Sequence, residues 1–103
     1  MNMKRKPQAP GQILEAQFMQ PNSITQKELA SHAGWTRKHV NLLCKGKARV
    51  TIDTALILGK VFGTGPDYWL ELQQAVDLWD ALHSEERKER LDGIMPLMKM
   101  AAA

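Results

Sequence analysis

Cysteine is nearly absent from this sequence, since Cys44 is the only one in 103 residues. A lone cysteine excludes an intrachain disulfide. Together with three scattered histidines, it also leaves no ligand set for a structural zinc, so we expect no metal and no cofactor. We interpret Cys44 as a small buried hydrophobic residue rather than a redox sensor, because it adjoins the apolar position Leu43.

Long hydrophobic runs are also missing. No unbroken apolar stretch is longer than that from Ala55 to Leu58, whereas a membrane span needs roughly 18 apolar residues. The basic start Lys4-Arg5-Lys6 lacks the apolar segment of a secretory signal. We therefore predict a cytoplasmic protein that has no membrane partner.

An excess of glycine and proline is also absent: the chain has only seven and five of them, which is ordinary globular usage, and 44% of it is hydrophobic. This composition argues against disorder, and the length suits one domain with its own core. Strand-like alternation of apolar and polar residues is absent, and apolar residues recur at helical spacing instead. The predicted fold class is all-α.

Acidic residues are rare in the first half of the chain. Residues 1–50 contain nine Lys and Arg against two Glu, a net charge of +7, and residues 51–103 contain five against nine acids, a net charge of −4. The basic half predicts attraction to a polyanion, and nucleic acid is favoured over a membrane because no basic helix has a large apolar face. A merely solvated basic surface is the alternative.

Turn and capping residues divide the chain into six predicted helices. Thr25 and Glu28 form a capping box, and Gly34 can adopt the left-handed conformation that ends a helix. The predicted segments run from Pro10-Gly11 to before Pro21, from Thr25 to about Ala33, from Thr36 to Lys45-Gly46, from Thr51 to Gly63, from Gly65-Pro66 through Trp79, and from Ser84 to Pro96.

The second and third of these helices have the pattern of a helix-turn-helix. With Gln26 as the first position, Ala30 falls where the helices approach, Gly34 falls in the turn, and Val40 falls where the second helix packs back on the first. The remaining apolar positions are Leu29, Ala33, Trp35 and Leu43. The pattern predicts that the helix after Thr36 is held outward for recognition.

The predicted recognition helix contains base-reading side chains. Arg37 suits guanine O6 and N7, Asn41 suits adenine N6 and N7, and Lys38 can contact a base or a phosphate. Leu42 either meets a thymine methyl group or packs in a partly buried position. Phosphate contacts, which set the register without reading sequence, are predicted for Gln26, Lys27, Thr36, Lys45, Lys47 and Arg49.

Two rings near this helix have alternative interpretations. Trp35 is either a core residue after the turn or an exposed ring beside the DNA backbone. His39 either contacts a phosphate weakly or is simply exposed, and we favour both over metal binding or a pH switch.

No arrangement of nucleophile, base and orienting group is visible, so we do not expect an enzyme.

The fifth predicted helix has an apolar stripe formed by Trp69, Leu72, Val76 and Trp79. Two large rings and two aliphatic side chains exceed what a short helix needs to dock on a four-helix core. We therefore predict that part of this stripe packs across a two-fold axis, with an all-intrachain core as the alternative.

Several motifs resemble the HigA antitoxin family, also named VapI, of the Xre/Cro helix-turn-helix group. They are Pro10-Gly11-Gln12-Ile13-Leu14-Glu15, Phe18-Met19-Gln20-Pro21, the helix-turn-helix, Thr51-Ile52-Asp53-Thr54-Ala55-Leu56 and Phe62-Gly63-Thr64-Gly65-Pro66-Asp67-Tyr68-Trp69-Leu70-Glu71-Leu72-Gln73. The resemblance covers about residues 10–79. Gly59 departs from it, because the family more usually has Ala there.

The resemblance implies a lambda-repressor-like domain of five helices plus a C-terminal helical extension. Residues 1–9 would be a basic tail, residues 10–82 the Xre-type DNA-binding and dimerisation domain, and residues 83–103 a polar helix and frayed tail. It also implies a homodimer that binds double-stranded operator DNA, represses its own toxin-antitoxin operon and neutralises a HigB-type mRNA endonuclease. By position, DNA reading falls on Thr36, Arg37, Lys38 and Asn41, and dimerisation on the helix from Trp69 to Trp79.

A basic toxin would be drawn to the acidic half of the chain, at Glu71, Asp77, Asp80, Glu85, Glu86 and Glu89. The first helix with its basic tail is a second candidate surface, and a solvated acidic face is the plain alternative. Two other functions remain open, a stand-alone Xre-type repressor without a toxin and an inhibitor or adaptor whose basic face binds protein or RNA.

Overall fold

Every regular element between residues 5 and 98, the part that the computed structural model describes, is helical. The helices are α1 (Pro10–Ile13), η1 (Leu14–Met19), α2 (Gln26–Ala33), α3 (Arg37–Cys44), α4 (Ile52–Phe62), α5 (Pro66–Leu82) and α6 (Glu85–Asp92). The predicted all-α class is therefore confirmed. No helix in the described part is long and apolar enough to cross a membrane.

The first predicted helix is continuous from α1 into η1, but its second half is π-helical. The amide of Gln20 donates to the carbonyl of Glu15, five residues back, at 2.9 Å. Such turns are rare and occur mostly as single insertions within α-helices. Buried Leu14 and Met19 lie at the two ends of η1 and both enter the core.

Threonine caps begin three of the helices, as the sequence predicts. The hydroxyl oxygens of Thr25, Thr36 and Thr51 accept from backbone amides three residues later, at 3.0, 3.0 and 3.2 Å. Glu28 completes the capping box, because its carboxylate accepts from the amide of Thr25 at 3.0 Å. These bonds satisfy amides that have no partner inside their own helix.

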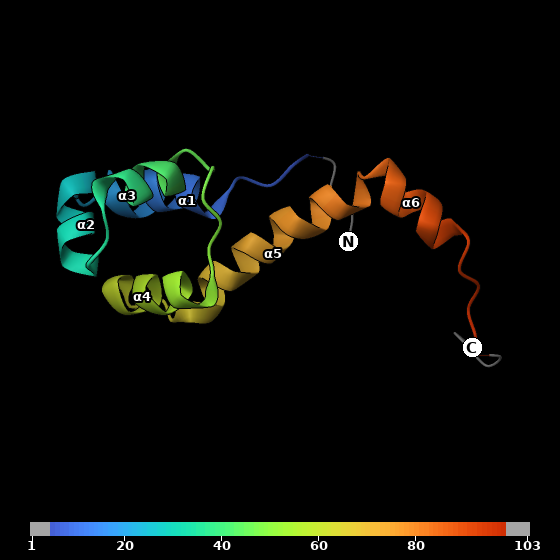
Figure 1. Ribbon diagram of the computed structural model, residues 1–103. Helices are drawn as coiled ribbons and strands as arrows, with labels where there is room; N and C mark the ends of the chain where they lie inside the picture. Colours follow the sequence, from blue (N-terminus) through green and yellow to red (C-terminus); the bar gives the residue numbers. More distant parts are fainter. Residues whose placement is uncertain (1–4, 99–103) are drawn as a thin grey trace.

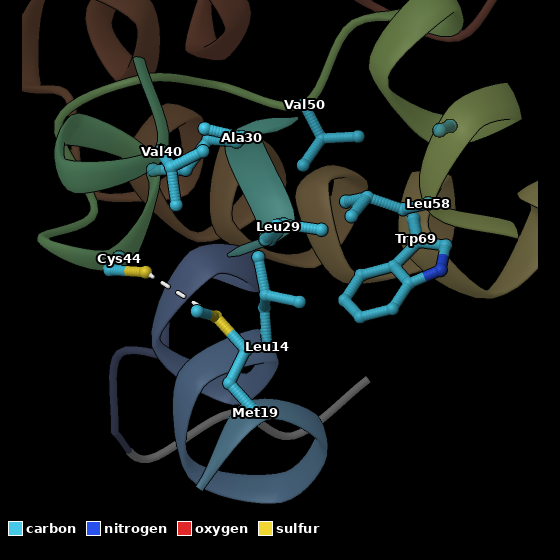
Figure 2. Close-up of a cluster of buried hydrophobic side chains, with 11 residues drawn as sticks. Leu14, Met19, Leu29, Ala30, Val40, Cys44, Val50, Leu58 and Trp69 are labelled. Atoms are coloured by element: carbon cyan, nitrogen blue, oxygen red, sulfur yellow. Dashed lines mark hydrogen bonds between the residues drawn. The ribbon is translucent and has the colours of Figure 1, made fainter. Parts of the chain in front are cut away.

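The core lies between α1, η1, α2 and α3 on one side and α4 with the start of α5 on the other (Figure 1). Its largest fully buried side chains are Trp69, Leu14, Met19, Leu29, Leu43, Leu58 and Val40. Figure 2 shows Trp69 beside Leu58, with Leu14 and Met19 approaching from the first helix. The ring of Phe18 extends this cluster, with its centroid 5.3 Å from that of Phe62 and 5.0 Å from that of Trp69.

Two glycines allow backbones to meet closely. A Cβ atom on Gly11 would lie 1.5 Å from the carbonyl oxygen of Leu43, so only glycine lets α1 pack against the end of α3. A Cβ atom on Gly59 would lie 2.5 Å from the carbonyl carbon of Gly65. This contact gives a physical reason for glycine at position 59, where the resembling family more usually has alanine.

The molecule is elongated, because α5 extends beyond the helical body and α6 follows it outward (Figure 1). Its extents are 55 × 26 × 22 Å, and its radius of gyration of 17.5 Å exceeds the roughly 13 Å of a compact chain this long. None of the side chains of α6 is buried. The projecting part therefore depends little on the core.

The predicted end of the sixth helix was wrong. Helix α6 ends at Asp92, before Gly93, and does not continue to Pro96. Because α6 packs no side chain into the core, only its local propensity sustains it, and glycine is a poor helix former.

The expectation of a frayed end falls partly on residues 99–103, and part of the basic tail on residues 1–4; both lie outside the described residues.

Candidate nucleic-acid interface

The turn between α2 and α3 fixes how α3 is presented. Gly34 adopts a φ of +76°, which favours glycine, and the next amide, that of Trp35, donates to the carbonyl of Ala30 at 2.8 Å. Val40 and Leu43 are fully buried on the inner face of α3. Arg37 and Lys38 are consequently exposed on the outer side.

Asn41, the third predicted base-reading residue, is half-buried and belongs to a polar network. Its side-chain amide donates to Oε1 of Gln26 at 3.3 Å, and Nε2 of Gln26 donates to a carboxylate oxygen of Glu15 at 3.4 Å. The carbonyl oxygen of Asn41 and its second N–H remain available to a partner. Gln26, predicted as a phosphate contact, thus also orients a neighbouring side chain.

The predicted phosphate-contacting residues occupy three places. Lys27 and Thr36 are exposed near the starts of α2 and α3, and Lys45 and Lys47 are exposed just after α3. The first turn of α3 has no acidic residue, whereas those of α2, α4, α5 and α6 each have one or more. The positive end of the α3 dipole is therefore unopposed by a local carboxylate.

Arg49, the remaining predicted phosphate contact, lies in an ion pair. Its Nη1 and Nη2 donate to the two carboxylate oxygens of Asp77, at 3.2 and 2.7 Å. Hydrogen bonds from Arg49 hold the pKa of Asp77 below its usual value, against a partial desolvation that raises it. The structure thus gives Arg49 an intrachain partner that the sequence analysis did not foresee.

Residues 5–9, which we call the N-terminal arm, make a second link between the basic and acidic halves. Lys6 Nζ lies 3.1 Å from a carboxylate oxygen of Asp80 and 5.8 Å from the ring centroid of Trp79. The indole of Trp79 stacks on the ring of His83, with centroids 3.7 Å apart and planes 15° apart. Two members of the predicted acidic surface, Asp77 and Asp80, are consequently paired within the chain.

The predicted dimer stripe divides between the core and the surface. Trp69 is completely buried within the chain and Val76 is 9% exposed, so both belong to the intrachain core. Leu72 and Trp79 are half-buried. Trp69 therefore offers no surface to a second copy in this conformation, and the alternative of an intrachain core holds for this part of the stripe.

Cys44 is buried, as predicted. Its Sγ lies 3.9 Å from Sδ of Met19 (Figure 2). Burial, followed by the charge and hydrogen bonding of Glu15, raises the pKa of the thiol to about 11. The thiolate, which is the reactive form, is therefore disfavoured near neutral pH.

The side chains with alternative interpretations are intermediate in exposure. Trp35 packs against the core but is only half-buried, and its ring meets that of His39 edge-on at 5.1 Å between centroids. His39 and Leu42 are also half-buried. Trp35 thus makes the predicted core contact and also keeps part of its ring exposed.

Sequence reasoning missed Gln73. This side chain is only 7% exposed, and its Oε1 accepts from the amide of Val50 at 2.8 Å. A signal was available, because Gln73 lies four residues after Trp69 and three before Val76, on the apolar face of the helix. A polar residue in that position requires a buried hydrogen-bond partner.

A tight turn between two short helices, with the second helix basic and exposed, defines a helix-turn-helix domain. A family model described as helix-turn-helix matches residues 16–69. The chain belongs to the HigA-type, VapI-like antitoxin family of the Xre/Cro helix-turn-helix group.

Particular relatives support this membership. Antitoxin HigA-1 of Vibrio cholerae is 39% identical over 82% of each chain. An uncharacterised helix-turn-helix transcriptional regulator of Haemophilus influenzae is 34% identical over 93% of this chain and 90% of its own. The structure of Pseudomonas aeruginosa antitoxin HigA with the higBA promoter superimposes with a TM-score of 0.81 at 28% identity, covering 89% of this chain and 99% of that one.

Proposed function

We propose that this protein is a sequence-specific DNA-binding antitoxin of the cytoplasm, which represses its own toxin-antitoxin operon and neutralises a HigB-type mRNA endonuclease. The observation that carries the proposal is the exposed basic face of α3 in a chain of this family. No acidic residue occurs between Thr36 and Lys47. The solved relative that contains promoter DNA supports the same conclusion.

In this proposal α3 enters the major groove. Arg37, Lys38 and Asn41 read base edges, and Lys27, Thr36, Lys45 and Lys47 contact phosphates. Gln26 supports the reading by holding Asn41, since the two side chains are hydrogen-bonded at 3.3 Å. The exposure of Arg37 and Lys38 leaves both free to reach a duplex.

The protein would bind as a homodimer on a palindromic site. Two recognition helices must then lie roughly 34–36 Å apart, one turn of DNA. Large exposed apolar side chains on α4 and α5 support a two-fold contact, namely Ile52 and Leu56 on α4 and Leu78 and Leu82 on α5. Of the predicted stripe, Leu72 and Trp79 stay available to extend this contact.

A toxin that holds RNA must present basic groups, and acidic side chains on α5 and α6 are complementary to it. Asp77 and Asp80 already have intrachain partners. Glu71, Glu85, Glu86 and Glu89 are exposed, and they form no ion pair within residues 5–98. We therefore place the toxin-attracting charge mainly on these four glutamates.

The DNA proposal is tested by a fluorescence titration of labelled duplexes. We expect the chain to bind its own promoter fragment at least a hundredfold more tightly than a scrambled duplex of equal length, because specific binding commonly exceeds non-specific binding by 10³ or more. Equal affinity for both duplexes would contradict sequence-specific repression.

The toxin proposal is tested by co-expression and pull-down with the product of the adjoining gene. A complex weakened by charge reversal at Glu85, Glu86 and Glu89 would support both the antitoxin role and its surface. A complex insensitive to these reversals would remove only the surface.

The second candidate function is a stand-alone repressor without a toxin. The Haemophilus influenzae relative, which is named only as a transcriptional regulator, favours it. Specific promoter binding together with no complex in the pull-down would decide for this candidate.

A further inference from the structure

The segment that follows the recognition helix, residues 45–51, is held by α3 at its start and by α5 near its end. It contains Lys45, Lys47 and Arg49. The amides of Lys45 and Lys47 donate to the carbonyls of Asn41 and Leu42, at 3.0 and 2.9 Å. The amide of Val50 donates to Oε1 of Gln73 at 2.8 Å, and Val50 itself is 3% exposed. This buried bond fixes the backbone of the segment to α5.

A second bond runs from the same glutamine. Nε2 of Gln73 donates to Oδ1 of Asp77 at 3.0 Å, one helical turn further along α5. Asp77 in turn accepts from both terminal nitrogens of Arg49. Consecutive residues of the segment, Arg49 and Val50, are therefore held by one continuous network on α5.

The geometry of the ion pair limits what Arg49 can do. Two parallel N–H···O bonds fix the plane of the guanidinium group and direct it at the carboxylate. The two side chains are 61% and 43% exposed, so the pair contributes little to stability. Its main effects are to orient Arg49 and to neutralise the charge of that residue.

We propose that Gln73 and Asp77 are positioning residues for DNA binding. We further propose that Arg49 belongs to their hydrogen-bonded network, which we call the brace, and is not a phosphate contact. The inference rests on the proposed DNA-binding function. Asp77 cancels the charge of Arg49, so the segment presents the two charges of Lys45 and Lys47 to a duplex. Gln73 anchors Val50 to α5, so it sets where α3 and the two lysines bonded to its end lie relative to α5.

The salt dependence of binding tests the role of Arg49. Binding weakens as salt is added, and each phosphate contact adds about 0.9 to the magnitude of the slope of log K against log salt concentration. This magnitude is called the slope below. We expect Lys45→Ala and Lys47→Ala each to lower the slope by about this amount, and Arg49→Ala to leave it unchanged. A slope lowered by about 0.9 in Arg49→Ala would overturn the proposal.

Asp77→Asn tests the brace from the other side and preserves the shape of the side chain. Once released from the carboxylate, Arg49 can reach a phosphate, so we expect the slope to rise by about 0.9 on both promoter and random DNA. In Asp77→Asn combined with Arg49→Ala, the slope should return to the wild-type value. An unchanged slope in Asp77→Asn would refute the neutralising role.

Gln73→Met tests the positioning of the segment, because methionine has a similar length but neither hydrogen-bonding group. We expect the ratio of promoter to random affinity to fall about tenfold, measured at a temperature where thermal melting shows that Gln73→Met is folded. An unchanged ratio in folded Gln73→Met would contradict positioning by Gln73.

These outcomes are separable from failure of the proposed function. The slopes can be measured on random duplex alone, so the brace is testable even if the wild-type chain shows no promoter preference. A wild-type chain that binds promoter and random DNA equally well would contradict the proposed repressor function. The slopes of the Arg49 and Asp77 variants would still decide the role of the ion pair.

Discussion

Arg37 and Lys47 are both exposed cations, yet they differ in which parts of a DNA duplex they can recognise. The planar guanidinium group of Arg37 can form two directed bonds to one guanine, whereas the ammonium group of Lys47 acts as a point charge. A residue that reads a base should affect only the correct sequence. A residue that contacts a phosphate should affect every sequence alike.

This difference leads to the first prediction. Arg37→Ala should cost about 1–3 kcal/mol on the promoter and much less on random DNA. Lys47→Ala is the control, because it should weaken both by a similar factor. Fluorescence anisotropy with the two duplexes measures the ratio, and an unchanged ratio in Arg37→Ala would show that this residue reads no base.

Burial of Cys44 leads to a second prediction, on the pH dependence of stability. The pKa of the thiol rises from an ordinary value of 9.0 to about 11 on folding. Between these values the unfolded chain loses the proton while the folded chain keeps it, so the free energy of unfolding should fall as the pH rises from about 9 to about 11.

Urea unfolding at several pH values measures this effect. Cys44→Ala is the control, because it removes the thiol while other groups still titrate. The difference in unfolding free energy between wild type and variant should be constant below pH 8 and should shift against the wild type above pH 9. A difference independent of pH would contradict the raised pKa.

At the scale of helices, the sequence predicted what neighbouring residues determine. The caps at Thr25, Thr36 and Thr51 and the turn at Gly34 depend on residues three or four positions apart, so their patterns are legible in the chain. The recognition helix followed from the same local signals. Val40 and Leu43, three residues apart, define the buried face of this helix, and the opposite face is therefore exposed.

The contacts that the sequence did not predict join distant residues. Gln73 meets Val50 across 23 positions, and Asp77 meets Arg49 across 28. Charge alone could not tell that Arg49 would form an ion pair within the chain. The partition of the α5 stripe was equally hidden, because burial of Trp69 depends on how α5 crosses α4.

The close approach of α1 and α3 leads to a third prediction. Gly11→Ala places a methyl group against the carbonyl of Leu43, and the helices must separate to admit it. We expect a loss of about 3 kcal/mol of unfolding free energy, at the upper end of overpacking costs. Urea unfolding measures it.

Gly93→Ala is the matched control for this substitution. A Cβ atom there would lie 3.6 Å from its nearest neighbour, the carbonyl oxygen of Arg90, which is an ordinary contact. Its effect should stay within about 0.5 kcal/mol. Equal effects of the two substitutions would show that the helices are not tightly apposed at Gly11.

At the scale of the molecule, the projecting end and the helical body should behave independently. No side chain of α6 is buried. A fourth prediction is that a chain ending at His83 keeps its unfolding free energy within about 0.5 kcal/mol. A larger loss in urea unfolding would mean that α6 supports the body.

The exposed apolar side chains near the end of α5 lead to a fifth prediction, on assembly. Leu78 and Leu82 are 39% and 57% exposed on successive turns of α5. Glutamate at both positions should shift sedimentation at tens of micromolar from dimer toward monomer, because it places charges in an apolar contact. Leu97→Glu, at a side chain 93% exposed beyond α6, is the control. Wild-type protein that sediments only as a monomer would contradict the dimer.

The three tryptophans occupy three different parts of the molecule. Trp69 lies in the core, Trp35 lies beside the recognition helix, and Trp79 lies under the N-terminal arm at Lys6. Indole emission depends on the solvent and the groups around the ring. Variants that keep one tryptophan each would therefore give three optical reporters, one for unfolding, one for DNA engagement and one for the contact with Lys6.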